Sequence, residues 1–172
     1  MAAQPQKPQF NFEPLGANHD RAAFSCGAAP LDRYLQTQAS QDMKRNLAAV
    51  FVLTPDGKTI AGYYTLSAYS VRLDKIPEEI ARKLTKMPEI PTTLIGRLAR
   101  STAFRSQGLG EILLTDALKR SLANSKQVAS WAVIVDAKDV NAFNFYKRYG
   151  FIEIPSAPNR LFLPMTTIAE LP

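Results

Sequence analysis

Residues 105–110 read Arg-Ser-Gln-Gly-Leu-Gly and lie between an apolar, β-branched stretch at 92–99 and an amphipathic stretch at 110–123. The first stretch predicts a strand, and the second predicts a helix because its leucines and alanines recur on one helical face. Two glycines one residue apart allow a tight turn in which successive backbone N–H groups point into one concavity. A helix N-terminus follows the turn, and Arg105 precedes it. The loop therefore predicts a site for a phosphorylated ligand.

The competing interpretation is an ordinary strand–helix connection whose glycines only permit close packing. Two better-known phosphate loops do not match the spacing. A Walker loop requires a Lys-Ser or Lys-Thr pair that is missing here, and the dinucleotide fingerprint requires a third glycine where the chain has Leu113. If the loop binds phosphate, it is a loop of another kind.

The rest of the chain follows the same periodic reasoning. A turn signal at 54–58 joins two strands into an antiparallel hairpin, and prolines at both ends make 72–92 an inserted connection rather than sheet. We expect helices at 25–39, 77–86 and 139–149, the last ended by Gly150, and further strands at 47–53, 59–71, 131–135 and 160–165. This order predicts a mixed α/β fold with one sheet covered by helices.

Length and composition limit the possible classes of protein. The 172 residues, 46% of them apolar, predict a single domain, 13–172, preceded by a flexible N-terminal tail at 1–12. The tail has no apolar core of a signal peptide and no membrane-length apolar run follows, so we expect a cytoplasmic protein without membrane contact. One cysteine and one histidine predict neither a disulfide nor a metal site. The net charge of +6 favours an anionic partner without identifying it.

The loop, together with a downstream strand and a helix that ends in Asn-Phe-Tyr-Lys-Arg-Tyr-Gly-Phe at 144–151, resembles the acetyl-CoA site of the GNAT N-acetyltransferase superfamily. This resemblance implies a mostly antiparallel sheet that splays at the cofactor. It places the pantetheine along Leu98, Ala99 and Arg100. The pyrophosphate would lie at the loop residues Arg105, Ser106, Gln107, Gly108, Leu109 and Gly110.

The helix at 139–149 carries the candidate catalytic residue. The resemblance assigns the general acid to Tyr146, which would protonate the departing thiolate, while its helical stripe also fits a core aromatic. Many family members have an asparagine where this chain has Asp139. Asn141 is the nearby candidate for that cofactor contact, and the sequence leaves open which of the two serves.

A narrower resemblance runs from about residue 13 to 165 and includes Phe24-Ser25-Cys26-Gly27 and Gly96-Arg97-Leu98-Ala99-Arg100. These stretches are similar to GNAT toxins of bacterial toxin–antitoxin pairs. That similarity implies a toxin that acetylates the α-amino group of aminoacyl-tRNA and is neutralised by a ribbon-helix-helix antitoxin. We also expect a homodimer. The alternatives are a GNAT enzyme acting on a small amine or a protein amine, and a catalytically silent basic module that binds RNA or a partner.

No carboxylate or histidine stands out as a general base. His19 lies in a loop-like stretch and is expected to be solvated, and Cys26 is expected to be a small residue at a helix start. A free α-amino group titrates at about 7.7–8.0, so a neutral fraction exists at pH 7 without a base, which favours an α-amine acceptor. For RNA contact, the best basic candidates are Lys44, Arg45 and Arg97.

Overall fold

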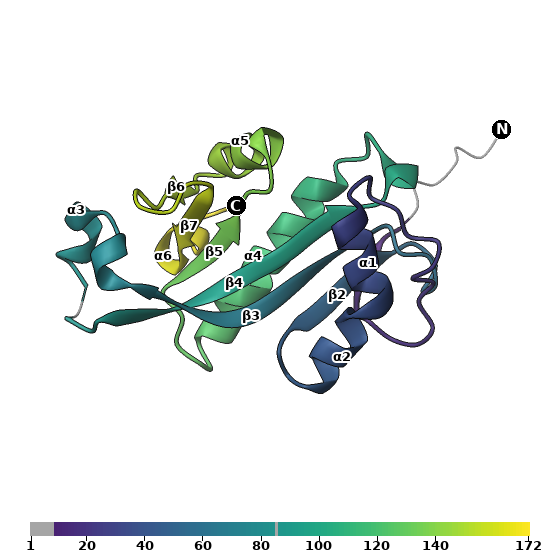
Figure 1. Ribbon diagram of the computed structural model, residues 1–172, viewed down its shortest axis with the longest axis horizontal. Helices are drawn as coiled ribbons and strands as arrows, with labels where there is room; N and C mark the ends of the chain where they lie inside the picture. The colour runs from purple at the N-terminus through teal and green to yellow at the C-terminus, as the bar shows by residue number, and fades with distance from the viewer. Residues whose placement is uncertain (1–8, 85) are drawn as a thin grey trace. The chain divides into compact units, whose positions relative to one another are not determined.

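The computed structural model describes residues 9–84 and 86–172, in which seven strands form one sheet in the order β1-β2-β3-β4-β5-β7-β6. The chain forms two compact units, one from 1–65 and 97–113 and the other from 66–96 and 114–172. Strands β3 (Gly62–Arg72) and β4 (Glu89–Arg100) and helix α4 (Leu109–Ser125), which are labelled in Figure 1, each contain residues of both units. The mixed α/β class and the mostly antiparallel sheet flanked by helices are confirmed.

The first unit contains strands β1 (Asn11–Pro14) and β2 (Ala49–Thr54), helices α1 (Ala29–Thr37) and α2 (Ala39–Lys44), and the short helix η2 (Thr102–Phe104). β1 and β2 pair antiparallel, and α2 packs beside β2 (Figure 1). The core of this unit is built from aromatic and aliphatic side chains, namely Leu15, Phe24, Tyr34, Leu35, Ala39, Val50, Val52, Ile60, Tyr63 and Ala99.

The helix predicted at 25–39 is shorter, since α1 covers only residues 29–37, and a second helix that the sequence did not predict, α2, begins at Ala39 after Gln38. Pro30 stands in the first turn of α1, where its missing N–H costs no hydrogen bond. Ahead of the helix, the carboxylate of Asp32 accepts the N–H of Cys26 at 2.9 Å, which fixes the approach of the chain. Cys26 is half-buried against the core, as expected of a small residue near a helix start.

The second unit contains η1 (Leu73–Lys75), α3 (Glu78–Ala81), β5 (Ala132–Asp136), α5 (Val140–Arg148), β6 (Ile152–Glu153), β7 (Arg160–Pro164) and α6 (Met165–Ile168). β4 pairs parallel with β5, and β7 pairs antiparallel with both β5 and β6. Trp131 stacks on Phe162 at 5.3 Å between ring centroids, within a second apolar core.

Three local expectations need correction. Asn11 and Phe12 belong to β1 rather than to a tail, because pairing with β2 orders a segment whose own composition carries no strand signal. β4 begins at Glu89, inside the predicted insertion, and includes Pro91, whose carbonyl accepts the N–H of Trp131 at 2.8 Å. The helix expected at 77–86 is reduced to the single turn of α3. None of the described helices is long and apolar enough to cross a membrane.

Candidate active site

The chain leaves β4 along a path that backbone hydrogen bonds fix. The N–H of Ser101 donates to the carbonyl of Ala61, and the N–H of Thr102 donates to the carbonyl of Ser25, each at 2.8 Å. The hydroxyl of Ser101 accepts the N–H of Ala103 and so caps η2. The loop that follows therefore starts from a fixed point.

The loop at 105–108 is exposed and has an unusual backbone. Ser106 (φ 63°) and Gly108 (φ 70°) both adopt left-handed conformations, and Leu109, which is 1% exposed, anchors the first turn of α4. Left-handed residues separated by one position turn successive N–H groups toward one side, which is the geometry of an anion-binding nest. A Cβ added to Gly108 would meet nothing within 4 Å. Close packing inside the protein therefore does not explain this glycine, and the free space beside it suits a ligand.

Gly62, by contrast, is required by close packing. A Cβ at this position would lie 2.8 Å from Cδ1 of Leu113 and 3.0 Å from the carbonyl oxygen of Ala99. The first residue of β3 thus allows β4 and the start of α4 to approach closely. Its importance could not be recognised from the sequence, because the crowding comes from residues 37 and 51 positions away.

Among the strand residues predicted to bind pantetheine, Ala99 is buried and Leu98 and Arg100 are half-buried. The parallel pairing of β4 with β5 ends at Ile95 opposite Val135, while β4 continues to Arg100. The three residues thus follow the last position at which β4 pairs with β5.

At the N-terminus of α5, the side chain of Asp139 has a role within the fold. The Oδ1 atom of Asp139 accepts the N–H of Ala142 at 2.8 Å, so this carboxylate is the N-cap of the helix. Asn141 lies exposed in the first turn. Asp139 is therefore engaged in capping, whereas the side chain of Asn141 forms no hydrogen bond or ion pair with the described residues.

Tyr146 is 7% exposed on α5 and packs against the rings of Phe145 and Phe151, each at 5.3 Å between centroids. Burial, aided by the negative charge of Asp136, raises the pKa of Tyr146 to about 12. Within the described part of the chain, no residue forms a hydrogen bond with its hydroxyl. The phenol is therefore protonated at neutral pH, and its proton is not committed to another described residue.

The carboxylate of Asp136 is itself paired. Nε and Nη2 of Arg160 contact its two oxygens at 2.7 and 2.9 Å, and Nη1 of Arg160 donates to the hydroxyl of Tyr69. The bond to Asp136 raises the pKa of Arg160, so the pair is held in its ionic form. An Asp whose two oxygens are both occupied in this way is poorly suited to act as a general base.

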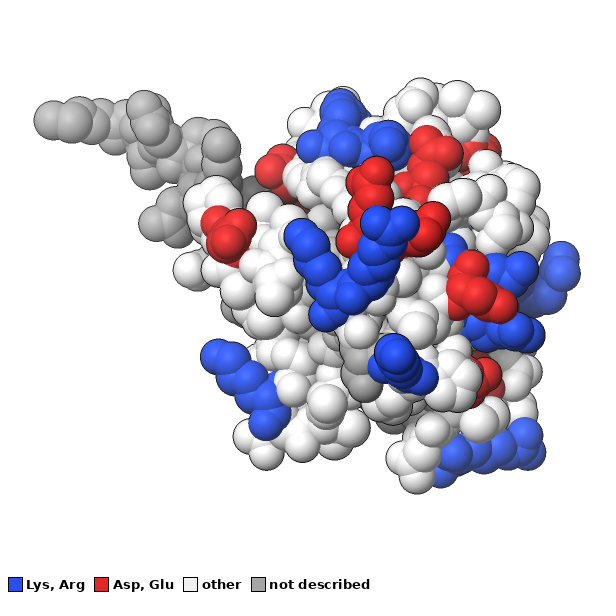
Figure 2. All heavy atoms as spheres, turned by 90° about the vertical axis from the view of Figure 1, so that its left-hand side faces the viewer, with Lys and Arg blue, Asp and Glu red and all other residues white. Residues whose placement is uncertain are grey.

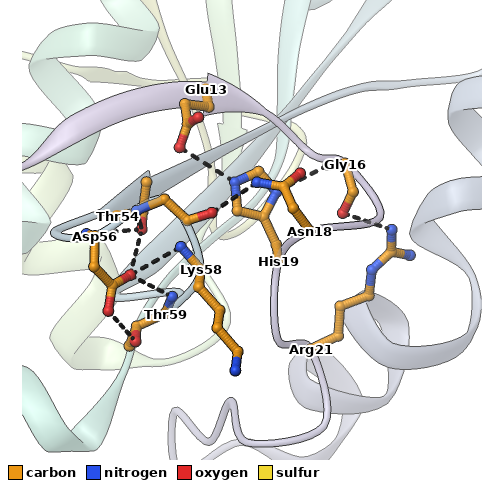
Figure 3. Close-up of polar contacts among 10 residues, drawn as sticks. Glu13, Gly16, Asn18, His19, Arg21, Thr54, Asp56, Lys58 and Thr59 are labelled. Carbon is orange, nitrogen blue, oxygen red and sulfur yellow. Dashed lines mark hydrogen bonds and ion pairs between the residues drawn. The ribbon is translucent and has the colours of Figure 1, made fainter.

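The expectation that His19 is solvated is wrong. Its side chain is buried, Nδ1 accepts the N–H of Gly16 at 2.9 Å, and Nε2 lies 3.3 Å from Oε2 of Glu13 (Figure 3). Beside it, Asn18 donates to the carbonyl of Gly57 at 2.7 Å. These contacts give His19 a structural role in fixing the turn that leads out of β1.

The three basic candidates differ in their surroundings. Lys44 in the last turn of α2 and Arg45 at its C-cap are exposed. Arg97 is half-buried, with its guanidinium carbon 3.4 Å from the centroid of the Tyr34 ring. The loop, the three strand residues and these basic residues belong to the first unit, and Tyr146 and Asn141 belong to the second. No cluster of three or more His, Cys, Asp or Glu suited to a metal occurs in 9–84 and 86–172.

Comparison with known proteins agrees with this geometry. Residues 80–167 match the acetyltransferase (GNAT) domain family. A probable toxin TacT of Sinorhizobium fredii is 34% identical over 169 residues, which is 93% of each chain. A tRNA-acetylating toxin of Mycobacterium tuberculosis is 32% identical and covers 85% of this chain and 86% of its own.

Solved structures of two toxins are also similar. A KacT variant in which a tyrosine is replaced by phenylalanine has a TM-score of 0.88 at 26% identity, covering 94% of this chain and 98% of its own. AtaT with acetyl-methionyl-tRNAfMet has a TM-score of 0.86 at 27% identity, with the same coverage. An AtaT variant bound to acetyl-CoA and the C-terminus of the antitoxin AtaR has a TM-score of 0.78 at 26% identity, covering 93% of this chain and 96% of its own. The chain belongs to the GNAT acetyltransferase family, in the branch that contains these bacterial toxins.

Proposed function

We propose that this protein is an acetyl-CoA-dependent N-acetyltransferase toxin that acetylates the α-amino group of aminoacyl-tRNA and thereby blocks translation. The observation that carries acetyl-CoA binding is the loop at 105–110, whose backbone is shaped for a pyrophosphate and whose Gly108 has open space where a side chain would stand. The tRNA-acetylating relative, aligned over 85% of this chain, supports the choice of acceptor.

In this proposal, the N–H groups of Ser106, Gln107, Gly108, Leu109 and Gly110 bind the pyrophosphate, together with the guanidinium of Arg105 and the N-terminus of α4. The backbone of β4 at Leu98, Ala99 and Arg100 binds the pantetheine. Asn141 provides a further cofactor contact from the start of α5.

Bound acetyl-CoA supplies the acetyl group as a thioester and a thiolate as the leaving group. Tyr146 acts as the acid of the reaction by donating a hydrogen bond to the departing sulfur, and the proton that the amine loses on forming the amide ends on the thiol of CoA. With a pKa of about 12 for the phenol, complete transfer to an alkyl thiolate of pKa about 8.5 would be uphill by about 5 kcal/mol. The phenol therefore stabilises the developing negative charge mainly by a hydrogen bond, which requires a hydroxyl that no other group has engaged.

The acceptor fits a site without a strong base. An α-amino group of pKa about 8 is partly neutral at pH 7, whereas a lysine amine of pKa about 10.4 would need deprotonation by the enzyme. The pairing of Asp136 with Arg160 and the burial of His19 leave neither group suited to that task. This chemistry supports an aminoacyl ester over a lysine side chain as acceptor.

For the tRNA itself we propose Lys44 and Arg45 as phosphate contacts, since both are exposed at one end of α2. The surface around α3 is less suited to binding tRNA phosphates, because its arginines are paired with carboxylates. Arg72 is paired with Asp74 at 2.8 Å and Arg82 with Glu78 at 2.7 Å. Figure 2, which looks at the side where α3 lies in Figure 1, shows acidic and basic side chains interspersed. A face of mixed sign is a poor surface for RNA.

We further propose that a ribbon-helix-helix antitoxin neutralises the protein, that the protein forms a homodimer, and that it acts in the cytoplasm, where charged tRNA is found. The AtaT structure with the C-terminus of AtaR supports the first point, because AtaT is similar over 93% of this chain.

The test is transfer of labelled acetyl groups from acetyl-CoA to aminoacyl-tRNA. We expect label on the aminoacyl ester, none on deacylated tRNA, and growth arrest when the protein is expressed alone. Transfer to small amines or protein termini with aminoacyl-tRNA untouched would indicate a general GNAT enzyme. Calorimetry that finds no acetyl-CoA binding would indicate a silent binding module.

A further inference from the structure

Arg97 stands in an aromatic and acidic environment that the sequence did not predict. Its guanidinium carbon lies 3.4 Å from the centroid of the Tyr34 ring, well inside the range of a cation–π interaction. Tyr34 is 5% exposed, and its other neighbour is the ring of Tyr63, stacked at 6.5 Å. The arginine that precedes the proposed cofactor strand residues is thus joined to helix α1.

The contact continues from α1 to α2. The hydroxyl of Tyr34 donates to Oδ2 of Asp42 at 2.9 Å, and the second oxygen of Asp42 accepts Nε2 of Gln38 at 3.0 Å. The carboxylate lies within electrostatic range of both Arg97 and Arg45, and together with its two hydrogen bonds these charges hold the pKa of Asp42 below its usual value. Asp42 therefore stays ionised as the point where α1, α2 and Arg97 meet.

Asp42 also determines how α2 ends. Its backbone carbonyl accepts the N–H of Leu47 at 2.9 Å, so the chain turns back on this residue directly after Lys44 and Arg45. The exposed basic end of α2 is consequently one turn of helix away from the carboxylate that Tyr34 holds.

We propose that Arg97 is a positioning residue that acts through Tyr34 and Asp42 to hold Lys44 and Arg45 in place for aminoacyl-tRNA. This inference rests on the proposed function, and it assigns Arg97 a role other than the direct RNA contact that the sequence suggested. The link consists of one cation–π contact and one hydrogen bond, both within the first unit.

The central variant is Tyr34→Phe, because it removes only the hydroxyl of a residue that is 5% exposed and leaves every charge in place. We expect KM for aminoacyl-tRNA to rise about three- to tenfold, the range that one hydrogen bond supports, with kcat and acetyl-CoA affinity unchanged. An aminoacyl-adenosine acceptor, which lacks the tRNA body, should show no change in KM. Tyr63→Phe is the control, because it removes the hydroxyl of another buried tyrosine that donates to the carbonyl of Leu31 on α1 and not to α2.

Two further variants distinguish positioning from direct contact. Asp42→Ala removes a negative charge beside Arg45, so electrostatics alone predicts tighter tRNA binding, whereas loss of positioning predicts weaker binding. Adding Tyr34→Phe to Asp42→Ala should change KM little further, because the bond between Tyr34 and Asp42 is already broken. Arg97→Lys keeps the charge but loses the planar group that covers the ring, and it should raise KM like Tyr34→Phe.

The inference fails if Tyr34→Phe leaves KM for aminoacyl-tRNA unchanged, if Tyr63→Phe raises it equally, or if aminoacyl-adenosine is affected as strongly as tRNA. Full activity of Arg97→Lys would favour direct contact of Arg97 with RNA and would also overturn the inference. Failure of the proposed function is a separate result: the wild-type protein would then acetylate no aminoacyl-tRNA, and the positioning role would fall with it.

Discussion

Two groups of buried tyrosines, one in each unit, differ in what their hydroxyls do. In the first unit, Tyr34 donates to Asp42 and Tyr63 donates to the carbonyl of Leu31 at 2.6 Å. In the second, no described residue engages the hydroxyl of Tyr146. Burial raises the pKa of both Tyr34 and Tyr146 to about 12, so acidity does not separate these two residues. A phenol whose proton is already committed holds structure together, and one whose proton is uncommitted is available for chemistry.

The largest expected effect tests this division directly. Tyr146→Phe keeps the ring that packs against Phe145 and Phe151 but removes the proton donor. General acid catalysis contributes about 10²–10⁴-fold, so single-turnover acetyl transfer to aminoacyl-tRNA should slow on that scale, and toxicity should disappear with it. Acetyl-CoA affinity should be retained, because the loop at 105–110 is unchanged.

Tyr34→Phe is the matched control for that measurement, since it removes a hydroxyl of equal pKa and should leave kcat within about threefold of wild type, far short of the general-acid range. A rate for Tyr146→Phe that is also within threefold would show that Tyr146 is a core aromatic and that the acid lies elsewhere.

A smaller effect concerns binding rather than chemistry. Gly108→Trp would fill the open space beside the loop, and we expect acetyl-CoA affinity measured by calorimetry to fall at least about tenfold, or about 1.4 kcal/mol. Gly57→Trp is the control, because Gly57 also has a left-handed backbone (φ 79°) and open space around it, yet lies in the turn after β2. Equal affinity of the folded Gly108→Trp protein would remove the loop from the cofactor site.

The sequence was sufficient where function depends on neighbours along the chain. The spacing of Gly108 and Gly110 between a strand and a helix predicted the exposed loop, and the helical stripe containing Tyr146 predicted α5. Both features are local, so propensity and periodicity could reveal them. Whether Tyr146 and the loop act as proposed is a question for the variants above.

The sequence was insufficient where distant residues meet. Arg97 looked like a surface base, but a ring 63 positions earlier lies under its guanidinium. His19 looked solvated because its stretch is polar, but Glu13 and Gly16 supply partners that permit its burial. In each case a hydrogen bond or a cation–π contact offsets the desolvation of a polar group. Such contacts join residues that are separated along the chain, so no local sequence pattern indicates them.

The tyrosine whose loss should slow the reaction most, Tyr146, is expected to contribute least to the free energy of unfolding. Tyr63→Phe leaves the half-buried carbonyl of Leu31 without this donor and should cost about 1 kcal/mol or more in the free energy of unfolding. Tyr146→Phe breaks no hydrogen bond within the described chain, so its unfolding free energy should stay within about 0.5 kcal/mol of wild type. Urea denaturation of both variants provides the measurement. A loss for Tyr146→Phe as large as that for Tyr63→Phe would mean that the phenol has a structural partner after all.

The smallest expected effect concerns the acetyl-transfer rate, which should not decline at alkaline pH. The fraction of neutral α-amine rises through pH 7.7–8.0, so the acetyl-transfer rate should increase to about pH 9 and then level off. Tyr146 must stay protonated to act as an acid, and with its pKa raised from 10.0 to about 12 it loses its proton only above about pH 11, whereas an unshifted phenol would begin to lose it near pH 9. The rate is best measured with an acceptor in which an amide replaces the labile ester, so that hydrolysis of the substrate does not imitate a decline. A plateau from pH 9 to 10.5 is the expected result. A fall with a midpoint near 10 in the folded protein would mean that Tyr146 is better solvated than its 7% exposure implies, and the contrast between an uncommitted buried acid and the committed tyrosines of the first unit would no longer hold.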